Sequence, residues 1–153
     1  ELHGIGFPKH FLVQPVECGS RTFFIDTFDD GNILLKGDLL SWHQQWQIDV
    51  PFEECIQPSS NRQIILRVCH NLFYAHNRLQ NNEGMLRSIE RLMILEPKLT
   101  ELHRTRSVVL GRLRKYAESI EALEDYMLFH PNASDIVDCQ REVEMLRQLL
   151  QKR

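Results

Sequence analysis

The spacing of apolar residues along the first third of the chain predicts strands. Short clusters of apolar, aromatic and β-branched residues alternate with turn residues, a pattern typical of β-structure. We expect strands over residues 10–16 and 21–28, joined by turn residues at 17–20. Residues 33–35 form either a short third strand or a lead into a helix, after a turn at 29–32.

The next segment predicts one helix and then a connector. Apolar residues from Leu39 to Trp46 recur at helical spacing, which predicts a helix over 38–47. Residues 51–60 hold two prolines and two serines and are typical of a connector. We therefore expect two domains, 1–60 and 61–153.

Beyond residue 60 the apolar residues recur with a period of about 3.6, which predicts five amphipathic helices. The expected breaks are short, at Asn81-Asn82, Pro97, Arg114-Lys115 and Pro131-Asn132, so neighbouring helices run antiparallel. The five stripes are Ile65, Cys69, Leu72, Ala75 and Leu79; Met85, Ile89, Leu92 and Met93; Leu102, Val109, Leu110 and Leu113; Ile120, Leu123 and Met127; and Ile136, Val143, Leu146 and Leu149.

The helical region also repeats. A shift of thirty-four residues places Pro97 on Pro131 and aligns the apolar stripes before them. This period with a terminal proline is typical of tetratricopeptide hairpins, which stack because one hairpin cannot bury its apolar face alone. We expect two hairpins and a capping helix over 133–151, with an unrelated helical bundle as the alternative.

Charge and cysteine content restrict the classes of function. The net charge is −3, divided into −6 for residues 1–60 and +3 for residues 61–153, so it gives no general case for nucleic-acid binding. The four cysteines form no CxxC pair, which favours a reducing, cytoplasmic compartment. No apolar run approaches the ~18 residues of a membrane span, so we expect no membrane partner.

Metal and cofactor sites are not expected. The seven histidines form no HxxxH or HExxH pair, and Gly4-Ile-Gly6 lacks the third glycine of a dinucleotide loop.

His10 and Asp26 are the candidate pair for chemistry. If Cys18-Gly19 is a two-residue hairpin loop, His10 lies opposite Thr27, and a shift by one residue pairs it with Asp26 directly. A carboxylate at that place would orient the imidazole, as in the base half of a nucleophilic triad. From these residues alone, a purely structural pair is the alternative.

Several motifs resemble the SirB family of transglutaminase-like proteins. In that family a papain-like transglutaminase core precedes a tetratricopeptide tail. The resemblance therefore implies an α+β fold, with a small antiparallel hairpin remnant of the core followed by an all-α array. The motifs are Gly4-Ile-Gly-Phe-Pro-Lys-His-Phe-Leu-Val13, Phe24-Ile-Asp-Thr-Phe-Asp-Asp-Gly31, Leu34-Leu35, Pro58-Ser-Ser-Asn-Arg62, Leu66-Arg67 and Asn71-Leu72.

The resemblance implies that His10 is the catalytic histidine and Asp26 the aspartate that orients it. The cysteine nucleophile of that superfamily belongs at a helix start some tens of residues before the histidine, and this chain has nine residues there. Cys18 follows the histidine and is a poor substitute.

A partner groove is expected on the first helix of each hairpin. Residues that would line it are Arg67, His70, Asn71, Tyr74 and Arg78 from the first, and Glu101, Arg104, Thr105 and Arg112 from the second. The alternative is that this face packs against residues 1–60 or the last helix.

The sequence therefore predicts a non-catalytic interaction or regulatory protein with a protein or peptide partner. The alternative is a cysteine-dependent acyltransferase or protease-like enzyme whose nucleophile segment is absent from this chain. An exposed sheet edge in residues 1–60 also favours homo-oligomers.

Overall fold

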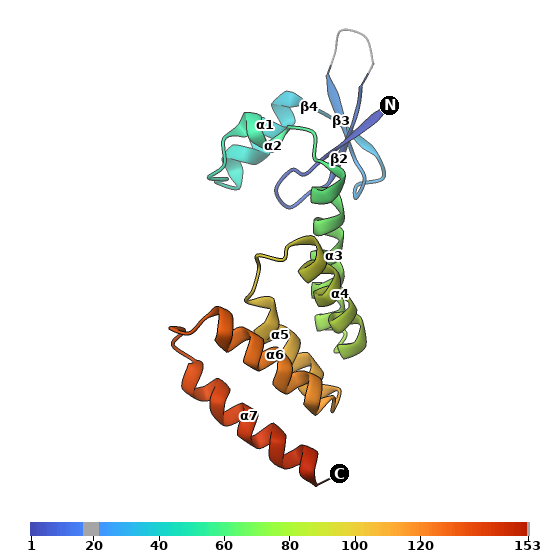
Figure 1. Ribbon diagram of the computed structural model, residues 1–153. Coiled ribbons are helices and arrows are strands. Elements are labelled where there is room, and N and C mark those ends of the chain that lie inside the picture. Colours follow the sequence, from blue (N-terminus) through green and yellow to red (C-terminus); the bar gives the residue numbers. More distant parts are fainter. Residues whose placement is uncertain (17–21, 153) are drawn as a thin grey trace. The chain divides into compact units, whose positions relative to one another are not determined.

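The computed structural model describes residues 1–16 and 22–152, which form a four-stranded antiparallel sheet followed by seven helices (Figure 1). The α+β prediction is confirmed. The chain divides into two compact units, Glu1–Ile65 and Leu66–Arg153. The division falls within helix α3, Asn61–Arg78.

The sheet of the first unit contains a strand over residues 2–5 that was not predicted, and residues 33–35 belong to a strand rather than to the lead into a helix. Its order is β1 (Leu2–Ile5), β2 (Leu12–Pro15), β3 (Phe23–Asp26) and β4 (Asn32–Leu35), each antiparallel to the next. The predicted Cys18-Gly19 loop lies outside the described residues. The β3–β4 turn is confirmed, with Gly31 at φ +78°, which glycine adopts without a steric penalty.

The connector expected over residues 51–60 is partly structured. Its first half contains the short helix α2, Phe52–Cys55. Its second half pairs with β1, because the Ser59 N–H donates to the Gly4 carbonyl at 2.8 Å and the Gly6 N–H donates to Ser59 Oγ at 3.0 Å. The predicted connector thus contains local structure, since backbone groups of β1 pair with it.

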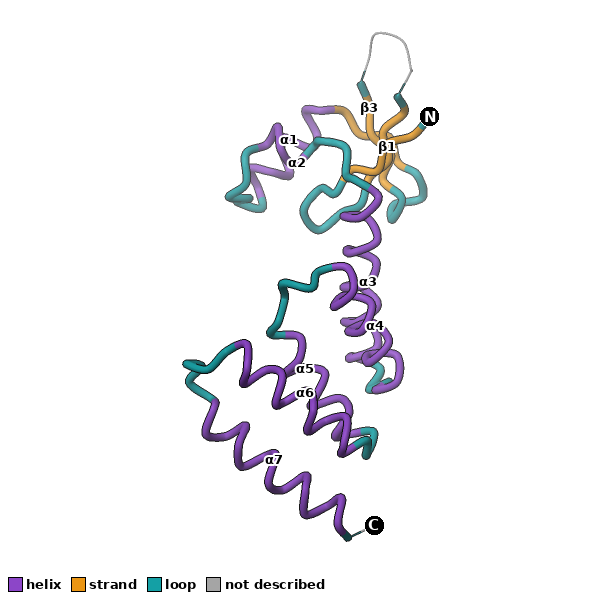
Figure 2. The backbone as a smooth tube through the Cα atoms, in the orientation of Figure 1, coloured by secondary structure: helices purple, strands orange, loops and turns teal. Residues whose placement is uncertain are grey.

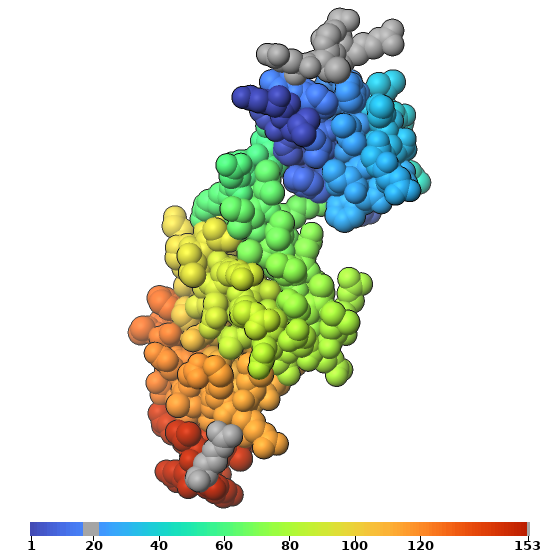
Figure 3. Space-filling model, turned by 90° about the vertical axis from the view of Figure 1, so that its right-hand side faces the viewer, coloured from blue at the N-terminus to red at the C-terminus, as the bar shows by residue number. Residues whose placement is uncertain are grey.

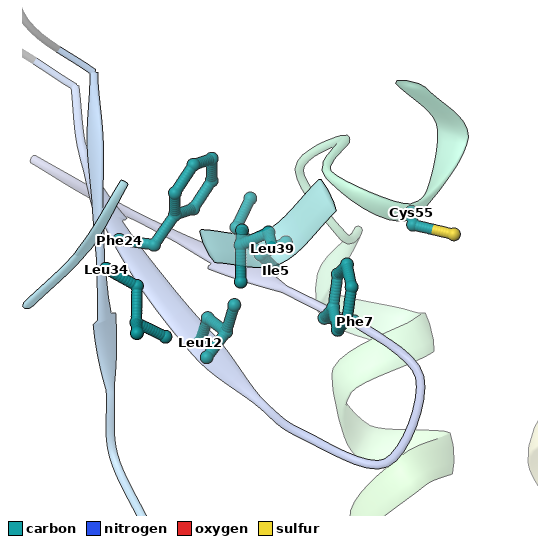
Figure 4. Packing of buried hydrophobic residues seen from close by; sticks show 7 residues of the cluster. All are labelled: Ile5, Phe7, Leu12, Phe24, Leu34, Leu39 and Cys55. Atoms are coloured by element: carbon teal, nitrogen blue, oxygen red, sulfur yellow. The ribbon is translucent and has the colours of Figure 1, made fainter. Parts of the chain in front are cut away.

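One face of the sheet packs against α1, Lys36–Gln45, which begins two residues before the predicted helix. The Asp38 carboxylate accepts the Leu35 N–H at 2.7 Å and satisfies one backbone donor at the start of this helix. The core between sheet and helices is apolar (Figure 4), and its buried members are Ile5, Phe7, Leu12, Phe24, Leu34, Leu39 and Cys55.

The second unit contains the predicted helices with the predicted breaks (Figure 2). Atoms of the array follow one another in sequence order in Figure 3, so each segment packs on its neighbours in the chain. After α3 come α4 (Asn82–Leu95), α5 (Leu102–Arg112), α6 (Tyr116–Phe129) and α7 (Ile136–Gln151).

The thirty-four-residue period recurs in the backbone. Helices α4 and α6 start thirty-four residues apart and end thirty-four residues apart. The loops before them match as well, since Gln80 (φ +53°) and Arg114 (φ +60°) are both left-handed. Corresponding hydrogen bonds join Asn81 N–H to the His76 carbonyl (2.9 Å) and Lys115 N–H to the Leu110 carbonyl (3.0 Å).

The stripe predicted for α3 was largely wrong. Cys69 is buried, but Ile65 is 50% and Leu79 is 76% exposed. The buried apolar residues of the second unit instead come mainly from α4 to α7. They form two clusters, Met85, Leu86, Ile89, Val109, Leu110 and Ala122, and Ile120, Leu123, Cys139, Val143 and Leu146.

Gly84 permits the close approach of α3 and α4. A Cβ at this position would meet His76 ring atoms at 2.4–2.6 Å. We expect Gly84→Ala to destabilise the second unit by about 1 kcal/mol, because the clash exceeds the gain in helix propensity. Thermal unfolding followed by circular dichroism measures the effect.

The His76→Ala background is the control for this prediction. With the imidazole removed, Gly84→Ala should become neutral or stabilise by up to about 1 kcal/mol. The same destabilisation in both backgrounds would show that His76 is not the obstacle.

Candidate functional site

The first unit brings His10 and Asp26 together. His10 Nδ1 lies 2.8 Å from Asp26 Oδ2, and the two side chains are 28% and 2% exposed. The second carboxylate oxygen of Asp26 accepts the Phe28 N–H at 2.9 Å. Both oxygens of this buried carboxylate are therefore hydrogen-bonded, as a buried polar group requires.

The two residues meet through a different register from the predicted one. Leu12 pairs with Asp26, and β2 begins only at Leu12, so His10 is not a strand residue and lies opposite neither Thr27 nor Asp26 in a ladder. The prediction of that ladder pair was wrong, although the side-chain contact exists.

A tight turn before β2 places His10 instead. The His10 N–H donates to the Phe7 carbonyl at 3.1 Å, with Pro8 and Lys9 between them. Lys9 has φ +67°. Proline followed by a residue with positive φ is the arrangement of a type II turn, in which glycine usually takes the second place. The strained Lys9 backbone thus directs the imidazole back over the end of β3.

Two tryptophans form a wall beside the imidazole. The His10 ring centroid lies 4.8 Å from Trp42 and 5.5 Å from Trp46, with an angle of 14° to Trp46. Lys9 Nζ lies 4.9 Å from the centroid of the Trp46 ring. From the sequence, Trp42 and Trp46 were predicted only as part of the apolar stripe of a helix. Their spacing of four residues places them on the same side of that helix, and this was the signal that they could pack together beside the imidazole.

The geometry orients a base. An ionised carboxylate only accepts hydrogen bonds, so Nδ1 carries the hydrogen and Nε2 of a neutral His10 keeps its lone pair. This is the orienter and base arrangement of nucleophilic triads. No hydrogen bond joins a thiol to the imidazole within residues 1–16 and 22–152.

The described thiols have the properties of structural cysteines. Cys55 is 6% exposed, and its thiol contacts the Val50 carbonyl at 3.8 Å. Burial and, to a lesser degree, Glu54 raise the pKa of this thiol. Cys69 and Cys139 are buried in the second unit. Cys18 lies outside the described residues.

Alkylation should confirm that Cys55 is inert. Since its pKa is raised, less thiolate exists at a given pH, and burial limits access. We expect iodoacetamide to modify native Cys55 at least tenfold more slowly than the same residue in urea, with half-maximal rate at a higher pH than for free cysteine. Peptide mass spectrometry measures both, and fast labelling at pH 7 would contradict the assignment.

An open groove runs between α3 and α5 within the second unit. It has a volume of about 370 Å³. A second pocket of about 350 Å³ lies beside it and shares Asn77 and Arg112 with it. The groove is lined by Phe73, Asn77, Met85, Arg104, Thr105, Val108, Val109 and Arg112, and the second pocket by Asn77, Gln80, Asn82 and Arg112.

The predicted groove residues divide between this surface and other places. Arg104, Thr105 and Arg112 line the groove, whereas none of the five residues predicted from α3 is among its lining residues. Phe73 and Asn77 take their place, because the face that α3 turns to α5 is rotated from the predicted one. Of those five, Arg67 and His70 are half-buried, and Asn71, Tyr74 and Arg78 are exposed.

Arg104 is already neutralised within the chain. Its guanidinium lies 3.4 Å from Asp135 and 2.8 Å from Glu142. The side chain thus links α5 to the start of α7 and leaves Arg112 as the charged residue at the groove. Arg67, which was also predicted to line the groove, is partly buried on α3, and this burial lowers the pKa of its guanidinium.

No three His, Cys, Asp or Glu side chains converge as metal ligands in residues 1–16 and 22–152. Over the same residues, no helix is both long and apolar enough to span a bilayer.

Comparison with known proteins finds a similarity over the segment that contains His10 and Asp26. Residues 1–70 match the family model of the transglutaminase-like superfamily. Two proteins named UPF0162 protein, from Xylella fastidiosa strains Temecula1 and 9a5c, are 24% and 25% identical to the chain over 141 residues. These alignments cover 88% of the chain and 50% of each relative, so the chain spans about half the length of the curated relatives it matches.

Proposed function

We propose that this chain is a non-catalytic protein-interaction protein, in which residues 1–70, the segment that matches the transglutaminase-like superfamily, do not perform catalysis. It keeps a histidine–aspartate pair of the transglutaminase type and binds a protein partner through its helical array. The SirB and tetratricopeptide assignments are part of the proposal, supported by the motif order and by the thirty-four-residue period of the backbone. Its cysteine content favours a cytoplasmic location.

The groove between α3 and α5 is the observation that carries the proposal. It combines apolar side chains, such as Phe73 and Val108, with the charged Arg112 and the amide of Asn77. Apolar surface beside a few polar groups that fix orientation is typical of binding sites. The residues that line the groove all lie in the helices α3, α4 and α5, so little backbone ordering is needed when a partner binds.

The described thiols support a non-catalytic role. Acyl transfer by a histidine–aspartate pair needs a thiolate within reach of the imidazole. Cys55 is buried with a raised pKa, and its contact is with a backbone carbonyl. The pair in its present surroundings therefore stabilises the turn before β2 and holds the tryptophan wall.

Site-specific photocross-linking tests the interaction function. Benzoylphenylalanine is placed at Thr105, which lines the groove, and at Leu128, which is 73% exposed on α6 and serves as the control. We expect a discrete cross-linked partner from Thr105 that is lost in Arg112→Glu. Equal cross-linking from both positions, or from Leu128 alone, would refute the groove as the binding surface.

The second candidate is thiol-dependent acyl transfer, with the cysteine supplied by residues outside this chain. The 2.8 Å contact between His10 and Asp26 favours it. In a longer protein that contains this chain, His10→Ala would then slow iodoacetamide labelling of one cysteine at least tenfold at pH 7. Unchanged labelling of every cysteine would exclude this candidate.

A second copy of the chain is a further proposed partner, bound through an edge of the sheet. Residues 58 and 59 cover part of β1, so self-association through a sheet edge would use β4.

A further inference from the structure

The groove and the pocket beside it form one surface with two chemically different halves. Asn77 and Arg112 line both, so the two are continuous. One half is apolar, with Phe73, Met85 and Val108. The other half is polar, with Gln80 and Asn82 beside the shared residues.

The polar half has a positive charge without a counter-charge. No acidic side chain is among the residues that line either pocket. In the part of the chain that the structure describes, no ion pair involves Arg112, whereas Arg104 nearby is paired with Asp135 and Glu142. A guanidinium beside three side-chain amides offers several N–H donors to one anion.

The loop that carries two of these amides is held in place before any ligand arrives. The Gln80 N–H donates to the Asn77 carbonyl at 3.0 Å. The Asn81 side chain accepts the Gly84 N–H at 2.9 Å and caps α4. The backbone that carries these amides is therefore fixed, so only their side chains have to be ordered when a ligand binds.

We propose that the polar half binds an acidic side chain of a partner peptide while the apolar half binds an apolar side chain two residues away; this rests on the proposed interaction function. A single guanidinium with neutral amides matches the one negative charge of a carboxylate and its two oxygens. In an extended peptide, residues two apart point to the same side, roughly 7 Å from each other. Neither pocket is an enclosed cavity, so the rest of a peptide can extend into solvent.

The test uses synthetic decapeptides, acetylated and amidated at their ends, with a central Glu-x-Leu and x varied. Matched sets carry Gln-x-Leu or Glu-x-Ser, and one Gln-x-Leu set has a free C-terminus. Fluorescence anisotropy with the full chain measures affinity. We expect Glu-x-Leu peptides to bind at least tenfold more tightly than either amidated control set. Arg112→Gln should remove the preference for Glu over Gln, and Arg91→Gln on α4 should keep it.

A second variant guards against misfolding of Arg112→Gln. Asn77→Asp places a carboxylate in the polar half and should weaken Glu-x-Leu peptides more than Gln-x-Leu peptides. Equal affinity for Glu and Gln peptides, a preference limited to the free C-terminus, or no binding of any peptide would each overturn the proposal. The interaction function is judged separately, because it stands if Thr105 still cross-links a partner that Arg112→Glu loses.

Discussion

Replacing Asp26 with alanine is expected to lower the free energy of unfolding of the first unit by about 3 kcal/mol. The carboxylate is buried and hydrogen-bonded to both the His10 ring and the Phe28 N–H. Its removal takes the acceptor away from the part-buried hydrogen bonds of the Phe28 N–H and the His10 ring, and it releases the imidazole from its place against Trp42. The turn before β2 and the β3–β4 turn lose their common anchor.

Tryptophan fluorescence measures this effect selectively. The chain has two tryptophans, Trp42 and Trp46, and both lie in the first unit. Asp26→Asn is the matched control, because its amide oxygen still accepts the Phe28 N–H, and it should cost about 1–2 kcal/mol. If Asp26→Ala unfolds at the same urea concentration as the wild type, the pair contributes nothing to the fold.

Ser107→Phe is expected to destabilise the second unit by at least about 3 kcal/mol. Ser107 and Ser119 are fully buried where α5 meets α6, with their Oγ atoms 3.0 Å apart. The Ser119 hydroxyl also donates to the Ser107 carbonyl at 2.9 Å, so the two helices are in close contact there. A phenyl ring has no space at this contact.

The first hairpin has large side chains at the positions that correspond to Ser107 and Ser119. Thirty-four residues earlier, Phe73 and Met85 occupy the equivalent positions and pack beside each other in the core. The same backbone repeat therefore accepts a large pair in one hairpin and a small pair in the other.

Circular dichroism at 222 nm follows the helices during urea unfolding. Ser107→Ala is the control and should cost about 1 kcal/mol, since the Ser119 hydroxyl keeps its backbone acceptor. A stability of Ser107→Phe close to that of Ser107→Ala would contradict the close contact.

The helical array was predictable because its signals are local. Pro97, Pro131 and the apolar periods mark where helices end, and the structure confirms every predicted break. The sequence did not predict which side of α3 is buried, because this helix has more apolar residues than the neighbouring helices cover. Ile65 and Leu79 fit the helical period and remain exposed.

The sequence predicted which two residues form the candidate site, but not the backbone conformation that brings them together. His10 and Asp26 meet as expected, but through a turn with Lys9 at positive φ, a conformation that sequence patterns assign to glycine. Strand β1 was missed because Gly4 lowers strand propensity. Its absent side chain leaves room for Phe11 and Ile64, which a Cβ at Gly4 would meet at 2.7 and 2.9 Å.

The affinity of the partner captured through Thr105 tests the central claim, that this chain acts by binding through the α3–α5 groove. The comparison is between Arg112→Glu and Arg91→Glu, two charge reversals on exposed helical arginines of the second unit. Isothermal titration calorimetry should find at least tenfold weaker binding for Arg112→Glu and a change of less than twofold for Arg91→Glu. Wild-type affinity of Arg112→Glu, or an equal loss in both variants, would contradict the account.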